Sequence, residues 1–310
     1  MVWIQDSSAY AQKVSSLMLD YCQLWLDTQE AKNLSPLTVK MYRETVMPFV
    51  KFLSKYAQSL DEVQPAHIRQ WILFKKRQGV KPQTLNNAYR LPKMFWQWCI
   101  KEGLTANDPF KNIERPKPER KVKPALTPEQ VEAILKACEG SDWQSKRNRA
   151  FVLTLLDTGM RLRECLSLKV EDVQKEQLLI KGKGGKQRFV FISPETRLAI
   201  KRYLLACPYS LTDNSPLWWT EKGEMTVNGA KRIIGAIGKR AGTSPLGAHA
   251  FRRTFATWSL RNGIDLEHLR LLMGHSDYTV LRQYLSLVEE DLKRAHSEFS
   301  PLRMLRKENR

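Results

Sequence analysis

Residues 177–192 read QLLIKGKGGKQRFVFI, and they form the clearest β-structure signal in this sequence. Two short runs with β-branched or aromatic residues, Leu178–Ile180 and Phe189–Ile192, flank the turn Gly182–Lys186. Such runs around a glycine-rich turn predict an antiparallel hairpin. The turn is not a nucleotide-binding loop, because the pattern GxxxxGK[ST] is absent. Lys183 in this turn is either an ordinary exposed lysine or a proton donor presented by the hairpin.

On the N-terminal side of the hairpin, residues 158–164 read TGMRLRE. Gly159 predicts that one helix ends in a left-handed conformation, which glycine adopts without strain. Arg161 then falls in the first turn of the next helix, where backbone N–H groups also face an anion. Arg161 is therefore either a phosphate-binding residue or a surface arginine paired with Glu164.

On the C-terminal side of the hairpin, a helix is predicted to carry His249 and Arg252. Their spacing of three residues places both side chains on one helix face. Phe251 and Phe255 are expected to seat the other face in the core. The alternative for this HxxR pattern is a capping histidine followed by a solvated arginine, which is the more common meaning of the pattern by itself.

A third motif, Met273-Gly274-His275, is followed nine residues later by Tyr284. A tyrosine in a helix is usually a core residue with one polar end. Tyr278 lies between the two and is a competing candidate for any chemistry done by a phenol.

Taken in chain order, these motifs supply a set of groups suited to attack on a phosphodiester: Arg161, Lys183, His249, Arg252, His275 and Tyr284. Arginines can hold a phosphate, lysine and histidine can move protons, and a phenolic oxygen can form a covalent link. This chemistry requires neither a metal nor a nucleotide. The sequence offers a convincing site for neither, so no cofactor and no metal are expected.

The N-terminal part, residues 1–110, is predicted to be a bundle of helices. Apolar residues recur there at intervals of three and four, as in Val46, Phe49 and Val50. Ser35 is the expected N-cap of one helix, with Pro36 as its first residue. The outer faces of these helices carry an excess of lysine and arginine.

Residues 111–126 form a basic, proline-rich stretch that predicts an extended linker. Thr127 and Pro128 then begin a helix with a cap and a first-turn proline. Beyond Pro194 only helices are expected. The predicted fold class is mainly α with a small antiparallel β-sheet, arranged as a helical domain over 1–110 and a mixed α/β domain over 127–310.

The net charge of the chain indicates which kind of molecule it binds. Among 310 residues, 51 lysines and arginines face 32 aspartates and glutamates, a net charge of +19. Such an excess attracts polyanions, and nucleic acid is the expected one. No apolar run reaches the roughly 18 residues that span a bilayer, so no membrane partner is expected. The 5 cysteines form no CxxC pair, which favours buried thiols in a reducing, cytoplasmic compartment.

The chain resembles the tyrosine recombinases, also called phage-type integrases. The family pattern TGxRxxE is matched by residues 158–164, its GKGxK turn by 182–186, HxxR by 249–252 and LGH by 273–275, with Tyr284 as nucleophile. Met273 replaces a leucine and Arg253 a histidine, but no catalytic group is lost. The N-terminal part resembles the family's core-binding domain. A simple two-domain member of Xer-like or transposon-integrase size fits best.

The resemblance implies a site-specific recombinase that cleaves and rejoins DNA strands through a 3′-phosphotyrosine and a Holliday junction, for integration, excision, transposition or dimer resolution. It implies double-stranded DNA recombination sites as partners and a homotetramer that exchanges C-terminal helices. A sister recombinase or an accessory factor are further candidate partners. Two alternatives remain: a type IB topoisomerase-like enzyme that relaxes DNA, and a basic DNA-binding regulator without catalysis.

Overall fold

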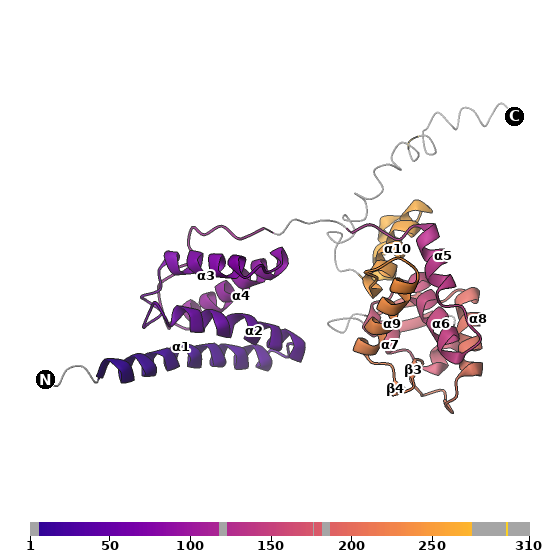
Figure 1. Cartoon of the computed structure of the whole chain (residues 1–310), viewed down its shortest axis with the longest axis horizontal. Coiled ribbons are helices and arrows are strands. Elements are labelled where there is room, and N and C mark those ends of the chain that lie inside the picture. The colour runs from indigo at the N-terminus through magenta and orange to yellow at the C-terminus, as the bar shows by residue number, and fades with distance from the viewer. Residues whose placement is uncertain (1–5, 118–122, 176, 182–186, 275–295, 297–310) are drawn as a thin grey trace. The chain divides into compact units, whose positions relative to one another are not determined.

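The computed structural model describes residues 6–117, 123–175, 177–181, 187–274 and 296. The chain divides into two compact units, Met1–Lys121 and Val122–Arg310. Each unit has its own apolar core, and Figure 1 shows the helices of both.

The first unit contains four helices in its described residues: α1 Asp6–Ala31, α2 Pro36–Leu53, α3 Pro65–Arg77 and α4 Pro82–Lys101. The predicted start of α2 is confirmed, because the Ser35 hydroxyl accepts a hydrogen bond from the Thr38 amide and Pro36 begins the helix. Aromatic rings fill the core between the helices, with Trp25 against Phe95 and Phe49 against Trp71.

After α4 the chain folds back and is tied to that helix. The Trp96 indole donates to the carbonyl of Asn107 at 2.8 Å. The Tyr89 hydroxyl donates to the carbonyl of Ile113 at 2.8 Å, and the Asn86 amide to that of Pro116 at 2.7 Å. The first part of the basic, proline-rich stretch is therefore anchored within the first unit.

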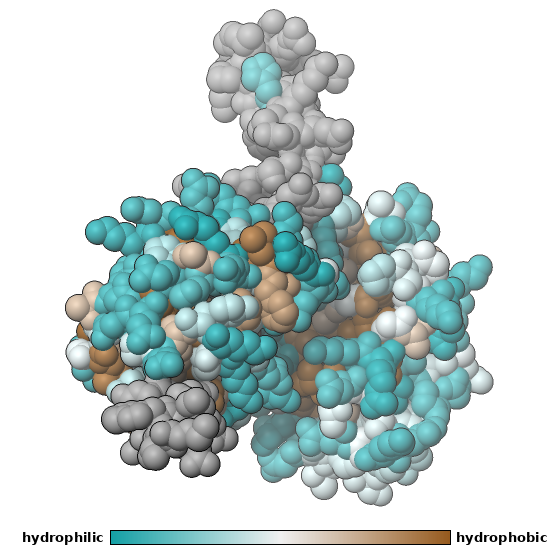
Figure 2. Space-filling model, turned by 60° about the vertical axis from the view of Figure 1, so that its left-hand side comes forward, coloured by the Kyte–Doolittle hydropathy of each residue, from teal (hydrophilic) through white to brown (hydrophobic). Residues whose placement is uncertain are grey.

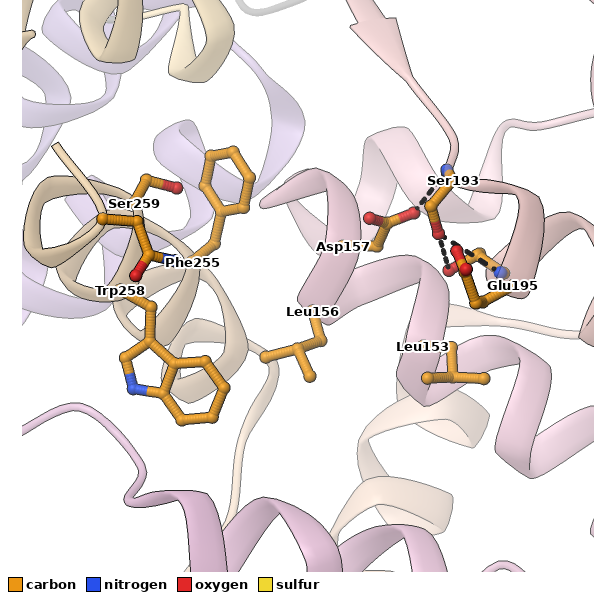
Figure 3. Close-up of a pocket in the computed structure, with 10 residues that line it drawn as sticks. Leu153, Leu156, Asp157, Ser193, Glu195, Phe255, Trp258 and Ser259 are labelled. Atoms are coloured by element: carbon orange, nitrogen blue, oxygen red, sulfur yellow. Dashed lines mark hydrogen bonds between the residues drawn. The ribbon is translucent and has the colours of Figure 1, made fainter. Parts of the chain in front are cut away.

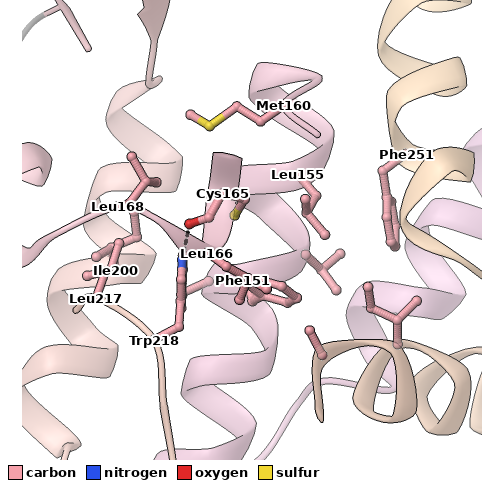
Figure 4. Close-up of a cluster of buried hydrophobic side chains, with 14 of the residues drawn as sticks. Phe151, Leu155, Met160, Cys165, Leu166, Leu168, Ile200, Leu217, Trp218 and Phe251 are labelled. Atoms are coloured by element: carbon pink, nitrogen blue, oxygen red, sulfur yellow. Dashed lines mark hydrogen bonds between the residues drawn. The ribbon is translucent and has the colours of Figure 1, made fainter. Parts of the chain in front are cut away.

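The second unit is also mainly helical: α5 Pro128–Lys136, α6 Trp143–Thr158, α7 Leu162–Leu166, η1 Val170–Gln174, α8 Pro194–Ala206, α9 Val227–Arg240, α10 Ala248–Arg261 and α11 Leu266–Met273. Helix α6 packs against both α8 and α10. The ring of Phe151, on α6, packs edge-on against the ring of Trp218, with the two ring centroids 5.0 Å apart. The Trp218 indole in turn donates to the Cys165 carbonyl at 2.8 Å, as Figure 4 shows. This core therefore satisfies its buried indole while it fixes α7 against α6.

The predicted hairpin is present and the predicted fold class is confirmed. Strand β1 Gln177–Lys181 pairs with β2 Gln187–Phe191 in antiparallel register, with Leu178 opposite Val190 and Ile180 opposite Arg188. Along β2, exposed and buried side chains alternate, so one face of the hairpin is turned toward the core.

The expectation that only helices follow Pro194 is wrong. Strand β3 Trp219–Thr220 pairs with β4 Gly223–Glu224 in a second antiparallel ladder. Gly223 has a φ of 102°, a conformation that glycine adopts readily. Strands of two residues are too short to show any alternation, which is why the sequence pattern does not reveal them.

The end of the proline-rich stretch is anchored to α10. The Leu126 amide donates to the Thr254 hydroxyl at 2.9 Å, and the Trp258 indole donates to the Leu126 carbonyl at 3.2 Å. The Arg253 guanidinium donates to the Pro124 carbonyl at 3.3 Å. The Thr127 hydroxyl then caps α5, as predicted.

The described surface is mostly hydrophilic, and the cysteines are mostly buried, as the sequence predicts. Figure 2 shows mostly hydrophilic side chains over the described residues of the face in view. Cys22, Cys99, Cys138 and Cys165 are buried, and Cys207 is half-buried. Among the described residues, no helix has the length and apolar character needed to cross a bilayer, and no three His, Cys, Asp or Glu residues are grouped as metal ligands.

Candidate active site

The position of Arg161 is set by the turn before it. Helix α6 ends at Thr158 and is capped by Gly159, whose φ of 58° is left-handed as predicted. A Cβ atom there would lie 2.5 Å from Cδ1 of Phe255, so a larger residue has no room. Arg161 is the N-cap of α7 rather than a residue of its first turn, because its backbone is still extended.

Arg161 is held along one edge by Glu164. Its Nη1 donates to Oε1 of Glu164 at 2.8 Å, and its backbone amide donates to Oε2 at 2.8 Å. Its Nη2 lies 3.5 Å from the Gly274 carbonyl. The predicted ion pair between Arg161 and Glu164 is therefore present, although 36% of the Arg161 side chain is exposed. A guanidinium has five N–H donors, so the contacts made within the described chain leave donors that can face a phosphate.

Arg252 is buried, with 4% of its surface exposed. Its Nη1 donates to the carbonyl of Gly159 at 2.6 Å, and its Nη2 donates to the carbonyl of Met273 at 2.6 Å. The alternative of a solvated arginine is therefore wrong. Arg252 joins the turn that precedes Arg161 to the end of α11, and these segments are far apart in the chain.

His249 lies one turn before Arg252 at the start of α10 and is exposed. Its pKa is lowered from its usual value, first by loss of hydration and then by the positive charges of Arg252, Arg253 and Arg161. Its imidazole is accordingly neutral at pH 7 and able to accept a proton. His249 belongs to the same cluster because it lies three residues before Arg252 on one face of α10.

The other three predicted residues, Lys183, His275 and Tyr284, lie outside the described residues. The described chain stops two residues before Lys183 and one residue before His275. Strand β1 ends at Lys181, and α11 closes at Gly274, which has a left-handed φ of 62°. Gly274, which directly precedes His275, is the residue whose carbonyl approaches Arg161.

Glu164 and Arg188 also belong to this cluster, and neither is among the site residues predicted from the sequence. Burial alone would raise the pKa of Glu164, but hydrogen bonds from Arg188 and Arg161 outweigh it and lower the pKa to about 2. Arg188 contacts both carboxylate oxygens of Glu164. The sequence pattern gives no signal for Arg188, because alternation would turn Phe189 and Phe191 inward, whereas the structure exposes them and buries Arg188 and Val190.

A separate pocket lies between α6, the start of α8 and α10 (Figure 3). Leu156, Phe255 and Trp258 supply apolar walls, and Asp157 accepts a hydrogen bond from the Ser193 amide at 2.8 Å. Its lining includes none of Arg161, His249 and Arg252. The pocket is therefore formed by the packing of α6, α8 and α10 and is not part of the arginine cluster.

Comparison with known proteins gives a consistent result. The model of the phage integrase family matches residues 124–290. The model of the phage integrase N-terminal SAM-like domain matches residues 23–103.

Similar proteins cover nearly the whole chain. A tyrosine recombinase XerC of Bacillus pumilus is 26% identical, over 94% of this chain and 97% of that protein. A tyrosine recombinase XerD of Ralstonia nicotianae is 27% identical, over 90% and 91%. The fold is similar to a crystal structure of the XerH site-specific recombinase bound to a palindromic difH substrate, with a TM-score of 0.72, 24% identity and coverage of 91% of this chain and 84% of that one.

Proposed function

This chain belongs to the phage integrase family of tyrosine recombinases, and on that premise we propose that Tyr284 attacks a DNA phosphodiester held by Arg161 and Arg252. The protein is a site-specific DNA recombinase that cleaves and rejoins DNA strands without ATP. The observation that carries the proposed site is that Arg252 donates to the carbonyl of Gly159, two residues before Arg161. This contact brings α10, which carries His249 and Arg252, to the turn that holds Arg161.

The arginines stabilise charge that develops on the phosphate. Arg252 is fixed by two backbone carbonyl oxygens, and Arg161 by Glu164. Because both are positioned before DNA binds, their side chains do not have to reorganise as the phosphorane-like transition state forms. His275 is proposed as a third group around the same phosphate.

Proton transfers accompany the exchange of bonds at phosphorus. His249 accepts the phenolic proton of Tyr284, whose unperturbed pKa near 10 makes it a weak nucleophile without a base. The tyrosine oxygen bonds to phosphorus as the bond to the 5′ oxygen breaks. Lys183 donates a proton to that leaving oxygen. A neutral His249, which its lowered pKa favours, is the form required for the base.

The covalent 3′-phosphotyrosine keeps the energy of the phosphodiester, so no nucleotide is consumed. A 5′-hydroxyl from a second duplex attacks the phosphorus, releases Tyr284 and takes the place of the first strand. Two rounds of this exchange pass through a Holliday junction. A type IB topoisomerase would instead return the same strand, and a regulator without catalysis would form no covalent link.

The nucleophile is tested by substitution. Tyr284→Phe removes only the phenolic oxygen, so the protein should bind its DNA site with nearly unchanged affinity and form no covalent adduct. Tyr278→Phe is the matched control and should form the adduct at the wild-type yield. The measurement is denaturant-resistant protein–DNA adduct on a nicked suicide substrate. An adduct formed by the Tyr284→Phe protein, or lost in the Tyr278→Phe protein, would reject the assignment of Tyr284.

We further propose that the protein works in the cytoplasm as a homotetramer on two DNA sites, assembled through its C-terminal tail. Val288, Leu292, Ala295 and Phe299 are spaced at three and four residues, and they lie outside the described residues. So short an apolar stripe needs a host surface to fold against. Truncation after Ser286 should preserve the complex with one site but abolish the paired complex and recombination in gel-shift and recombination assays. Recombination by the truncated protein would show that the tail is not the assembly element.

A further inference from the structure

Arg188 is a buried charge in the hairpin. It lies opposite Ile180 in the register, on the inward face of β2, and 7% of its side chain is exposed. A buried guanidinium is costly unless its charge and its donors are matched. What Arg188 contacts therefore indicates why it is there.

The contacts of Arg188 join three segments of the second unit. Its Nη1 and Nη2 donate to Oε1 and Oε2 of Glu164 at 3.1 and 2.7 Å, a two-pronged ion pair. Its Nε donates to the Leu272 carbonyl at 2.8 Å. Its Cδ would lie 2.8 Å from a Cβ atom on Gly274, so the glycine leaves the space that the arginine stem occupies.

Glu164 is shared between Arg188 and Arg161. Oε1 accepts from Nη1 of both arginines, and Oε2 accepts from Nη2 of Arg188 and from the Arg161 backbone amide. One carboxylate thus faces two guanidiniums, one buried and one partly exposed. If Arg161 were the only partner, the carboxylate would cancel the charge that the phosphate requires.

We propose that Arg188 is a positioning residue for the recombination reaction: it neutralises Glu164, so that Glu164 orients Arg161 while the charge of Arg161 stays available to the scissile phosphate. It also links the hairpin that carries Lys183 to the end of α11 next to His275. This inference rests on the proposed roles of Arg161 and Tyr284. Arg188 is buried against Glu164, so in this proposal it acts through Arg161.

The test removes the charge of Arg188 alone and then the charges of Arg188 and Glu164 together. Arg188→Met leaves Glu164 with Arg161 alone and should slow single-turnover cleavage of the suicide substrate by about 10²-fold, the scale expected when a remote change misplaces a catalytic group. The dissociation constant for DNA should change far less. The double variant Arg188→Met with Glu164→Gln also removes the uncompensated carboxylate. Its cleavage rate should therefore recover to within about tenfold of the wild-type rate, which corresponds to the free energy of one weakened hydrogen bond. Arg188→Lys keeps the charge and should also cleave faster than Arg188→Met.

Arg147→Met is the control for loss of a buried arginine. Arg147 is 5% exposed and donates to the Trp219 carbonyl, so its loss should affect stability and leave cleavage by the folded protein unchanged. A double variant that folds but cleaves as slowly as Arg188→Met would overturn the proposal. If Arg188→Met does not fold, an Arg188→Lys protein that folds and cleaves more than about 10²-fold below wild type overturns it. A wild-type protein without any adduct would instead reject the proposed function.

Discussion

Arg252 has 4% of its surface exposed, and it donates to the carbonyl oxygens of Gly159 and Met273, each at 2.6 Å. A charged side chain in such surroundings is both a structural link and a fixed source of positive potential. Its burial strengthens its interaction with a bound phosphate, because less water screens the charge. The neighbouring Arg253 is half-buried and contacts the Pro124 carbonyl instead.

Substitution separates these two adjacent arginines. Arg252→Ala should lower the single-turnover cleavage rate by about 10³- to 10⁵-fold, the range seen for arginines that stabilise a transferring phosphoryl group. The affinity for DNA should fall much less, because the interaction grows in the transition state. Arg253→Ala serves as the control and should keep most of the cleavage rate. Rates are compared for protein shown to be folded by circular dichroism, and equal losses in the two variants would contradict the assigned role of Arg252.

At the scale of elements, α10 carries functional and structural groups on different faces. His249 and Arg252 lie in the candidate site, whereas Thr254 and Trp258 bind Leu126 at the end of the proline-rich stretch. The Thr254 hydroxyl also donates to the Ala250 carbonyl at 2.9 Å. The helix therefore fixes the entry of the chain into the second unit beside the residues proposed for catalysis.

Two buried threonines on α10 give a matched pair. Thr254→Val leaves the Leu126 amide without its acceptor and should lower the free energy of unfolding by about 1–3 kcal/mol. The Thr257 hydroxyl is also buried, but within the described part of the chain it has no hydrogen-bond partner. Thr257→Val should therefore be neutral or stabilising. Urea unfolding of both variants measures the difference, and a larger loss for Thr257→Val would refute the account of this anchor.

At the scale of the whole molecule, the net charge of +19 is the dominant property. Both compact units carry basic residues, and the proline-rich stretch that spans their boundary is basic as well. Binding of such a protein to duplex DNA releases condensed counterions, which makes the affinity depend steeply on salt.

We expect the affinity for a duplex site to fall about 10³- to 10⁵-fold between 50 and 200 mM salt, as for about 6–10 phosphate contacts. Removal of residues 1–110 should reduce both the affinity and the slope against salt, because it removes one set of these contacts. Fluorescence anisotropy over a salt series measures both quantities. A slope near zero for the intact chain, or an unchanged slope after truncation, would exclude binding through both units.

The sequence alone was sufficient for those features that depend on local pattern. Helix starts at Ser35 and Thr127, the left-handed turn at Gly159 and the hairpin strands all follow from the conformational preferences of a few neighbouring residues. The family could be identified for the same reason, since its motifs are short and occur in a fixed order.

The tertiary structure alone decided which side chains are shared between segments. A local pattern pairs Arg161 with Glu164, but it cannot show that Arg188, from a different element, takes the same carboxylate. Nor could it distinguish a solvated Arg252 from one buried between Gly159 and Met273. These contacts join residues far apart in the chain, and their energy depends on burial and on the position of every packed element, which no local periodicity encodes.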